Sequence, residues 1–261
     1  SEGMAGYHAT LAMQAFGFEE MGDYARAEHL GKRAIDLEPR DGWAQHAVAH
    51  VMEMQCRQRD GIAWMRHNTE DWAGDSFLQV HNWWHLALFH YELGETEEAL
   101  ALFDAPIYGT HSTLALNMLD ASAILWRLHL RGVDVGDRWA ALGANWAPKA
   151  KDGIYAFNDV HAMMAFVGAG LDEPARLLLA AQEQAMAGSG NSVNRRGSAR
   201  TTRAFTSRRL ASLSRSSVWI GSPCLPSRCR KCSASAGRAW NPRNATRHPR
   251  ATPSMAQASS C

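Results

Sequence analysis

Residues 81–104, HNWWHLALFHYELGETEEALALFD, have the spacing of two antiparallel helices that cross closely. Two small side chains, Ala87 and Ala99, stand where the helix axes would approach each other most closely. Two bulky side chains, Trp83 and Phe103, are placed to fill the space beside that crossing. Side chains of one helix pack between those of its neighbour, so small residues are needed at a close crossing. The stretch therefore predicts one helix–turn–helix unit.

The same stretch fills most positions of the tetratricopeptide (TPR) pattern, in which a Trp, a Leu, a small residue and an aromatic precede the turn. An Ala and a second aromatic follow the turn. His90 stands where the pattern usually has Tyr. Gly94 is predicted to end the first helix, because glycine adopts the left-handed conformation without strain. The pattern positions are filled by Trp83, Leu86, Ala87, Gly94, Ala99 and Phe103.

Apolar residues recur at three- and four-residue steps through much of the chain, which predicts further helices. Pro39 and Pro148 mark two helix ends, and a loop is expected around 72–75. No stretch has the two-residue alternation of a strand. The predicted fold class is all-α, a TPR-like superhelical array of five antiparallel helix pairs. The helices expected outside 81–104 span 4–20, 24–37, 43–55, a segment from about 60, 112–131, 137–147, 154–170 and 172–187.

The net charge of +1 hides two segments of unlike composition. Residues 194–261 carry 14 of the 27 Lys and Arg residues and none of the 26 acidic ones. We therefore divide the chain into a helical repeat domain at 1–193 and a basic, Ser- and Arg-rich tail at 194–261. The tail could be a native segment that binds nucleic acid or an acidic membrane, a disordered linker, or a frameshifted product. We favour an unstructured, frameshifted tail, because two Trp and four Cys are unusual in an evolved disordered segment.

Three blocks rich in His and Trp resemble the tetratricopeptide repeat protein 38 family. They are HAVAHVMEM at 46–54, GIAWM at 61–65 and HNWWHLALFHYELG at 81–94. The resemblance covers about residues 3–193 and does not extend into the tail. It implies a helical-repeat fold, a soluble protein and an interaction role. It also implies a fragment, since members of the family are longer at both ends. It supplies no activity and no catalytic residue.

Histidine is the unusual residue type in the first segment. His46, His50 and Glu53 are spaced i, i+4, i+7, which places them within an arc of about 60° on one helix face. His81 and His85 form a second i, i+4 pair on the helix that begins the next unit. Because first helices of successive repeats stack side by side, the two pairs could converge. Imidazole and carboxylate groups suit Zn²⁺ or Fe²⁺, the only cofactors that the sequence suggests.

Two residues further along could complete such a centre. His161 could add a ligand, and Asp159 could hold the outer nitrogen of an imidazole. The alternative is that the histidines serve packing. The sequence favours this alternative, because His50 and His90 occupy the position usually held by a buried Tyr.

A third interpretation is a polar groove that also contains Trp84, the best candidate for an exposed aromatic. The candidate groove is His46, His50, Glu53, His81, Trp84, His85, Asp159 and His161. No nucleophile with a supporting base is recognisable, so no catalytic residue is assigned.

These observations favour a binding or scaffold module over an enzyme. The expected partner is a protein, a peptide or a small ligand, and nucleic acid is expected only if the basic tail is genuine. The alternative is a metal-dependent enzyme centred on the two histidine pairs. No apolar stretch approaches the roughly 18 residues that cross a membrane. We therefore expect no membrane association. Cys56 is the only cysteine of the first segment, so no disulfide framework is expected, and we expect a reducing compartment and a cytoplasmic location.

Overall fold

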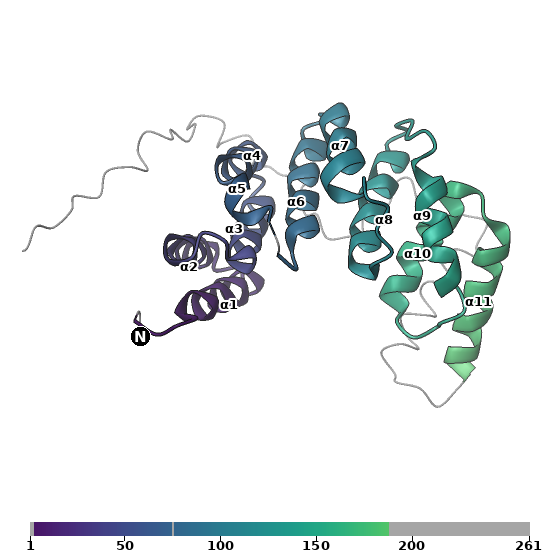
Figure 1. Ribbon diagram of the computed structural model, residues 1–261, viewed down its shortest axis with the longest axis horizontal. Helices are drawn as coiled ribbons and strands as arrows, with labels where there is room; N and C mark the ends of the chain where they lie inside the picture. Colours follow the sequence, from purple (N-terminus) through teal and green to yellow (C-terminus); the bar gives the residue numbers. More distant parts are fainter. Residues whose placement is uncertain (1–2, 75, 188–261) are drawn as a thin grey trace, which may run out of the picture. The chain divides into compact units, whose positions relative to one another are not determined.

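The computed structural model describes residues 3–74 and 76–187, which belong to one structural unit. These residues are all-helical and contain no strand (Figure 1). The predicted boundary at 193 and the basic tail lie outside the described residues. The α-helices are α1 (Tyr7–Glu20), α2 (Tyr24–Leu37), α3 (Gly42–Met54), α4 (Gln58–His67), α5 (Thr69–Trp72), α6 (Gln79–Glu92), α7 (Thr96–Leu102), α8 (Ala115–Leu130), α9 (Arg138–Trp146), α10 (Ala156–Ala169) and α11 (Asp172–Ala187).

The helices form five consecutive pairs: α1 with α2, α3 with α4, α6 with α7, α8 with α9, and α10 with α11. We call α1, α3, α6, α8 and α10 the first helices. Each first helix contacts the first helix of the next pair, so the five lie side by side in chain order. Residues on the touching faces of neighbouring first helices can therefore meet although they are far apart in the sequence.

Small residues allow the close crossings that the sequence predicted. Ala87 on α6 and Ala99 on α7 are fully buried, and Phe103 is 4% exposed beside them. Gly94 has a φ of 78° and ends α6 in the left-handed conformation, as expected. Gly61 on α4 lies against the ring of Phe89, with no room for a β-carbon. The main hydrophobic core runs through these crossings from α3 to α11.

Several predicted boundaries differ from the structure by a few residues, and two of these differences have a clear physical cause. The helix expected from 112 begins at Ala115, because the Ser112 hydroxyl accepts a hydrogen bond from the Leu114 amide and forms a turn ahead of the helix. The loop expected around 72–75 is preceded by the short helix α5. Its Trp72 is fully buried and donates its indole N–H to the Met65 carbonyl. Trp72 therefore fixes the otherwise polar helix α5 to the core.

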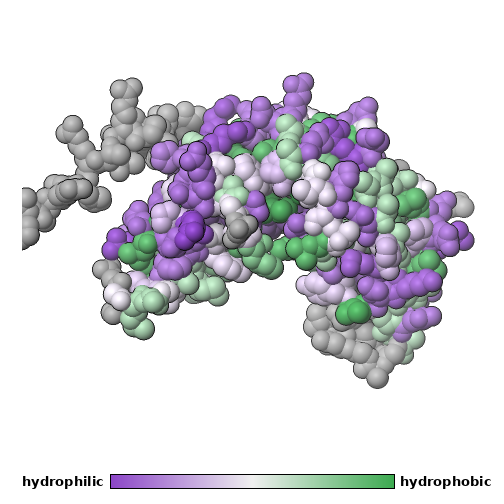
Figure 2. Space-filling view, in the orientation of Figure 1, coloured by the Kyte–Doolittle hydropathy of each residue, from purple (hydrophilic) through white to green (hydrophobic). Residues whose placement is uncertain are grey.

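The segment after α7 continues as a π-helical turn, Phe103–Ile107, which contains Pro106. Among the described residues, no helix has the length and apolar character needed to cross a membrane. Polar residues cover much of the face shown in Figure 2, and apolar ones are scattered among them.

Candidate metal centre

Four histidines from two first helices converge on one point. His46 and His50 project from α3, and His81 and His85 project from α6. One ring nitrogen from each lies within 4.8 Å of the others. Residues four apart share a face of a helix, and α3 packs against α6, so the two pairs face each other. The convergence that the spacing allowed is therefore present.

The inner members of this four-histidine cluster, His46 and His85, are buried, and three of their four ring nitrogens have no hydrogen-bond partner among the described residues. His46 is 5% exposed and His85 is 1% exposed. Both ring nitrogens of His46 and Nε2 of His85 are buried without a partner among the described residues. Buried polar side chains are nearly always hydrogen-bonded, so such nitrogens need an explanation. A bound metal ion satisfies the lone pair of a neutral imidazole.

Three carboxylates stand behind the cluster, each beside the Nδ1 atom of a different histidine. Glu53 Oε2 lies 2.9 Å from His85 Nδ1. Asp120 Oδ1 lies 2.9 Å from His81 Nδ1. Glu19 Oε2 lies 3.7 Å from His50 Nδ1.

Two of these carboxylates, Glu53 and Asp120, define the tautomer of the imidazoles that they contact. A carboxylate accepts a hydrogen bond, so Nδ1 carries the proton and donates it, and Nε2 keeps its lone pair. Carboxylates commonly hold metal-binding imidazoles in this way. The contacts reach across neighbouring helix pairs, since Glu19 lies on α1 and Asp120 lies on α8.

Burial keeps the inner imidazoles in the neutral form that binds metal. Desolvation lowers the pKa of His46, and the neighbouring imidazoles of the cluster lower it further. Burial also holds the pKa of His85 well below its ordinary value. Neutral imidazole is the form that donates a lone pair to a metal.

A carboxylate, Asp120, and a guanidinium, Arg127, are buried beside the imidazoles. Burial raises the pKa of Asp120, against the hydrogen bond and charge of His81. The buried guanidinium of Arg127 has a lowered pKa, chiefly because of desolvation, and lies near Glu53 and Asp120. Its central carbon is 5.3 Å from the Trp84 ring centroid.

Aromatic rings surround the imidazoles. Trp84 stacks on His81 with ring centroids 5.2 Å apart. Phe16 of α1 stacks on His46 at 5.5 Å, and Trp43 meets the same imidazole edge-on at 5.6 Å. Trp84 was expected to be an exposed groove aromatic, and the structure places it half-buried against the cluster.

The structure changes the roles of several residues that the sequence singled out. Glu53 was a candidate ligand, and it instead contacts the outer nitrogen of His85. Asp159 was expected to hold an imidazole, but it accepts a hydrogen bond from Gln182. His161 does not belong to the cluster, since its Nδ1 lies 2.8 Å from the Phe157 carbonyl oxygen of its own helix.

Two buried histidines differ in their hydrogen bonding. His90 is 5% exposed, and its two ring nitrogens contact Glu95 at 2.6 Å and Arg66 at 3.2 Å. His90 is therefore a hydrogen-bonded core residue, as predicted. His46 is equally buried, but neither of its ring nitrogens has a hydrogen-bond partner among the described residues, so it is not held as His90 is.

Two carboxylates of the centre were missed in the sequence. Asp120 lies within the Leu- and Ala-rich helix α8, and Glu19 lies near the end of α1. Both are 5% exposed. An acidic residue inside an apolar helix was a usable signal for Asp120, because burial of an unpaired carboxylate is costly. Glu19 had no such signal.

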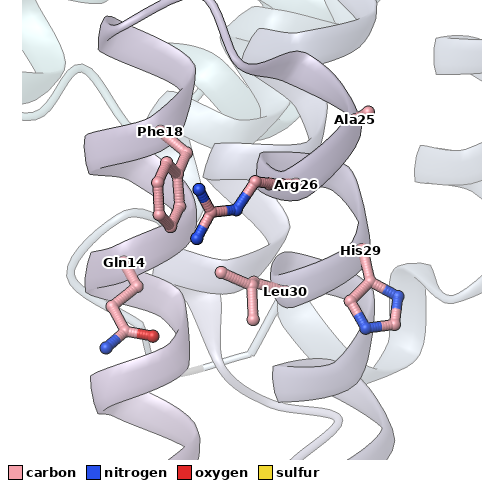
Figure 3. Close-up of a pocket in the computed structure, with 6 residues that line it drawn as sticks. All are labelled: Gln14, Phe18, Ala25, Arg26, His29 and Leu30. Atoms are coloured by element: carbon pink, nitrogen blue, oxygen red, sulfur yellow. The ribbon is translucent and has the colours of Figure 1, made fainter.

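A cavity of about 460 Å³ lies elsewhere, between α1 and α2. Figure 3 shows the Arg26 side chain extending across it toward Phe18, with the guanidinium carbon 3.9 Å from the ring centroid. The cavity contains none of the cluster residues and brings no acid, base and nucleophile together. Its lining residues are Gln14, Phe18, Ala25, Arg26, His29 and Leu30.

No known family model matches the chain, and no solved structure matches it.

Proposed function

We propose that this chain is a helical-repeat protein that binds a divalent transition-metal ion. The ligands are the four imidazoles of His46, His50, His81 and His85. The observation that carries the proposal is their convergence within 4.8 Å, with three buried ring nitrogens that have no hydrogen-bond partner in the described part of the chain. Buried imidazoles that only pack would find hydrogen bonds, as His90 does.

The ligand set favours an ion that prefers nitrogen. Imidazole suits Zn²⁺, Fe²⁺, Cu²⁺ and Ni²⁺, whereas Mg²⁺ and Ca²⁺ prefer oxygen. Tetrahedral Zn–N bonds of about 2.0–2.1 Å place the ligand nitrogens roughly 3.4 Å apart. The four nitrogens lie within 4.8 Å of one another, so they would have to close around an ion.

The charge around the centre suits a dication. In their ionised forms, Glu19, Glu53 and Asp120 together with the cation Arg127 sum to a charge of two negative. A divalent ion neutralises this buried set, which would otherwise be costly. The three carboxylates contact the imidazoles from the side away from the ion, where they also raise ligand basicity.

We also propose that the helix pairs form a TPR-like array related to the tetratricopeptide repeat protein 38 family. The support is the set of buried small residues at the repeat positions and the side-by-side packing of first helices. In such an array the metal would join two successive repeats. The acid groups of two more repeats would support it.

The experiment is metal analysis of the full chain, made without a His tag. The protein is stripped with a chelator, incubated with Zn²⁺ and desalted, and bound metal is measured by mass spectrometry. We expect about one equivalent for the natural chain and none for His85→Ala. The matched control is His161→Ala, which removes an equally buried histidine outside the cluster and should keep the metal.

Two outcomes would contradict the metal proposal. One is absence of bound zinc, iron, copper and nickel from a folded natural chain. The other is equal loss of metal in both variants, which would mean that uptake depends on general stability. Either outcome would favour a scaffold function over metal binding, since a scaffold needs no convergence of imidazoles.

A scaffold role for a protein or peptide partner is a second candidate. Large apolar residues are exposed where three first helices begin: Phe77 before α6, Leu114 before α8, and Tyr155 before α10. Exposed apolar side chains that gather on one edge are typical of interaction surfaces. The two functions are compatible, because the metal cluster and this edge use different residues.

A further inference from the structure

The four imidazoles of the proposed centre are not equally buried. His85 has 1% of its side chain exposed, whereas His50 has 27% and His81 has 21%. One histidine of each helix therefore faces the interior, and the other faces solvent. An ion held among them would be shielded on the side of His46 and His85 and approachable on the side of His50 and His81.

We infer that the ion keeps a coordination position for an exogenous ligand on the side of His50 and His81. We further infer that this position takes a small neutral nitrogen or oxygen donor in preference to an anion. The inference rests on the proposed metal binding and adds the class of molecule that the centre recognises.

The uneven burial of the histidines supports an open position. A structural zinc site is closed by its protein ligands, whereas a catalytic zinc site keeps a position for water or substrate. The partly exposed side chains of His50 and His81 place such a position on their side of the ion.

The walls beside the exposed histidines suit a planar, partly apolar ligand. Trp43 is 41% exposed and lies edge-on to His46. Trp84 stacks on His81 and is half-buried. Aromatic rings bind other flat rings by stacked or edge-on contacts.

The buried charges decide between neutral and anionic ligands. A dication already balances the three carboxylates and Arg127, so an added anion would leave a net negative charge in a half-buried site. A neutral donor adds no such charge. Two carboxylate oxygens, Glu19 Oε2 and Asp120 Oδ2, are buried without a hydrogen-bond partner among the described residues and sharpen this repulsion.

The experiment uses the full chain loaded with Co²⁺, whose visible spectrum reports coordination number. Imidazole serves as the neutral probe and azide as the anionic one. We expect imidazole to change the cobalt spectrum at a concentration at least tenfold lower than azide. Cobalt content is measured in the same samples, because the spectrum must change with the ion retained.

The variant Asp120→Asn tests whether buried negative charge makes the ion prefer a neutral ligand over an anion. It removes one negative charge and keeps the shape of the side chain, so the preference for imidazole over azide should fall at least threefold. The matched control is Asp159→Asn, which removes the charge of another buried carboxylate, on α10, outside the cluster. It should leave the preference unchanged.

The outcomes separate the two proposals. If no cobalt binds, the metal function itself fails. If cobalt binds but neither probe changes its spectrum, or if the change reflects cobalt loss, the centre is closed and only this inference fails. Tighter binding of azide than of imidazole would overturn the charge argument.

Discussion

At the scale of single residues, Asp120 shows how a buried acid can be explained by a neighbour on another helix. It is 5% exposed in the middle of the apolar helix α8, where a lone carboxylate would be costly. Its Oδ1 lies 2.9 Å from the Nδ1 atom of His81, and its other oxygen has no hydrogen-bond partner within residues 3–74 and 76–187. The residue is best explained as one that orients the His81 ring and raises its basicity toward an ion.

The variant Asp120→Asn should weaken Zn²⁺ binding by about 10- to 100-fold, the usual effect of removing a carboxylate that supports a metal-bound histidine. An amide still accepts a hydrogen bond from Nδ1 but supplies no charge. The measurement is competition with a chromophoric zinc chelator, with helix content checked by circular dichroism.

Asp159→Asn is the control for this effect, because it alters an equally buried aspartate whose hydrogen-bond partner is Gln182. It should leave zinc affinity within about threefold. Equal losses in the two variants would show that Asp120 acts through stability and not by orienting His81.

At the scale of helices, close crossings decide which positions tolerate an added methyl group. A β-carbon placed on Gly61 would come within 2.5 Å of the Phe89 ring, which is 1% exposed and cannot move aside. A β-carbon placed on Gly17, which lies on α1, would have nothing within 4 Å. The two glycines are both helical, so they differ mainly in packing.

We expect Gly61→Ala to lower the free energy of unfolding by about 1–3 kcal/mol, the usual cost of overpacking. Gly17→Ala should raise it by about 0.5–1 kcal/mol, because alanine loses less conformational entropy than glycine in a helix. Urea denaturation of both variants measures the difference. Equal stabilisation of the two would mean that α4 and α6 do not cross at Gly61.

The sequence predicted the helix pairs well because their signals are local. Gly94 has the positive φ expected of a residue that ends a helix, and Ala87 and Ala99 are buried as expected at a close helix crossing. Boundaries such as Ala115 were missed, since the Ser112 turn competes with the helix cap.

The centre was only partly predictable, because it depends on which faces of successive first helices touch. Spacing indicated that His46 pairs with His50 and His81 with His85, but not that both pairs meet. The role of Glu19 could not be predicted, because its contact with His50 joins α1 to α3 and does not depend on local residue spacing.

At the scale of the whole molecule, the proposed ion would connect helix pairs that otherwise touch only through packing. Its ligands lie on α3 and α6, and the supporting acids extend the network to α1 and α8. Each helix pair packs on its neighbours, so a bond between two pairs should affect the stability of both. Metal binding and folding should therefore be coupled.

We expect Zn²⁺ at a hundredfold excess over its dissociation constant to stabilise the full chain by about 2.7 kcal/mol. For a chain of this size the gain should raise the melting temperature by roughly 5–10 °C. A chelator should reverse the shift. Hydrogen exchange should slow in α3 and α6 and stay unchanged in α11.

His85→Ala provides the comparison for this thermal shift. It should melt at the same temperature with and without Zn²⁺, because one of the four ligands is gone. A zinc-dependent rise as large as that of the natural chain would place the stabilising ion elsewhere in the molecule.

Because all four imidazoles project from helices and none from a loop, changes in chain length should divide into two kinds. A residue inserted between His46 and His50 turns one imidazole away by about 100°, since a helix has 3.6 residues per turn. A residue inserted in the turn between α3 and α4 leaves both histidine pairs on their faces. Natural relatives of this chain can therefore differ freely in the lengths of such turns, while an insertion within α3 or α6 removes the centre in one step.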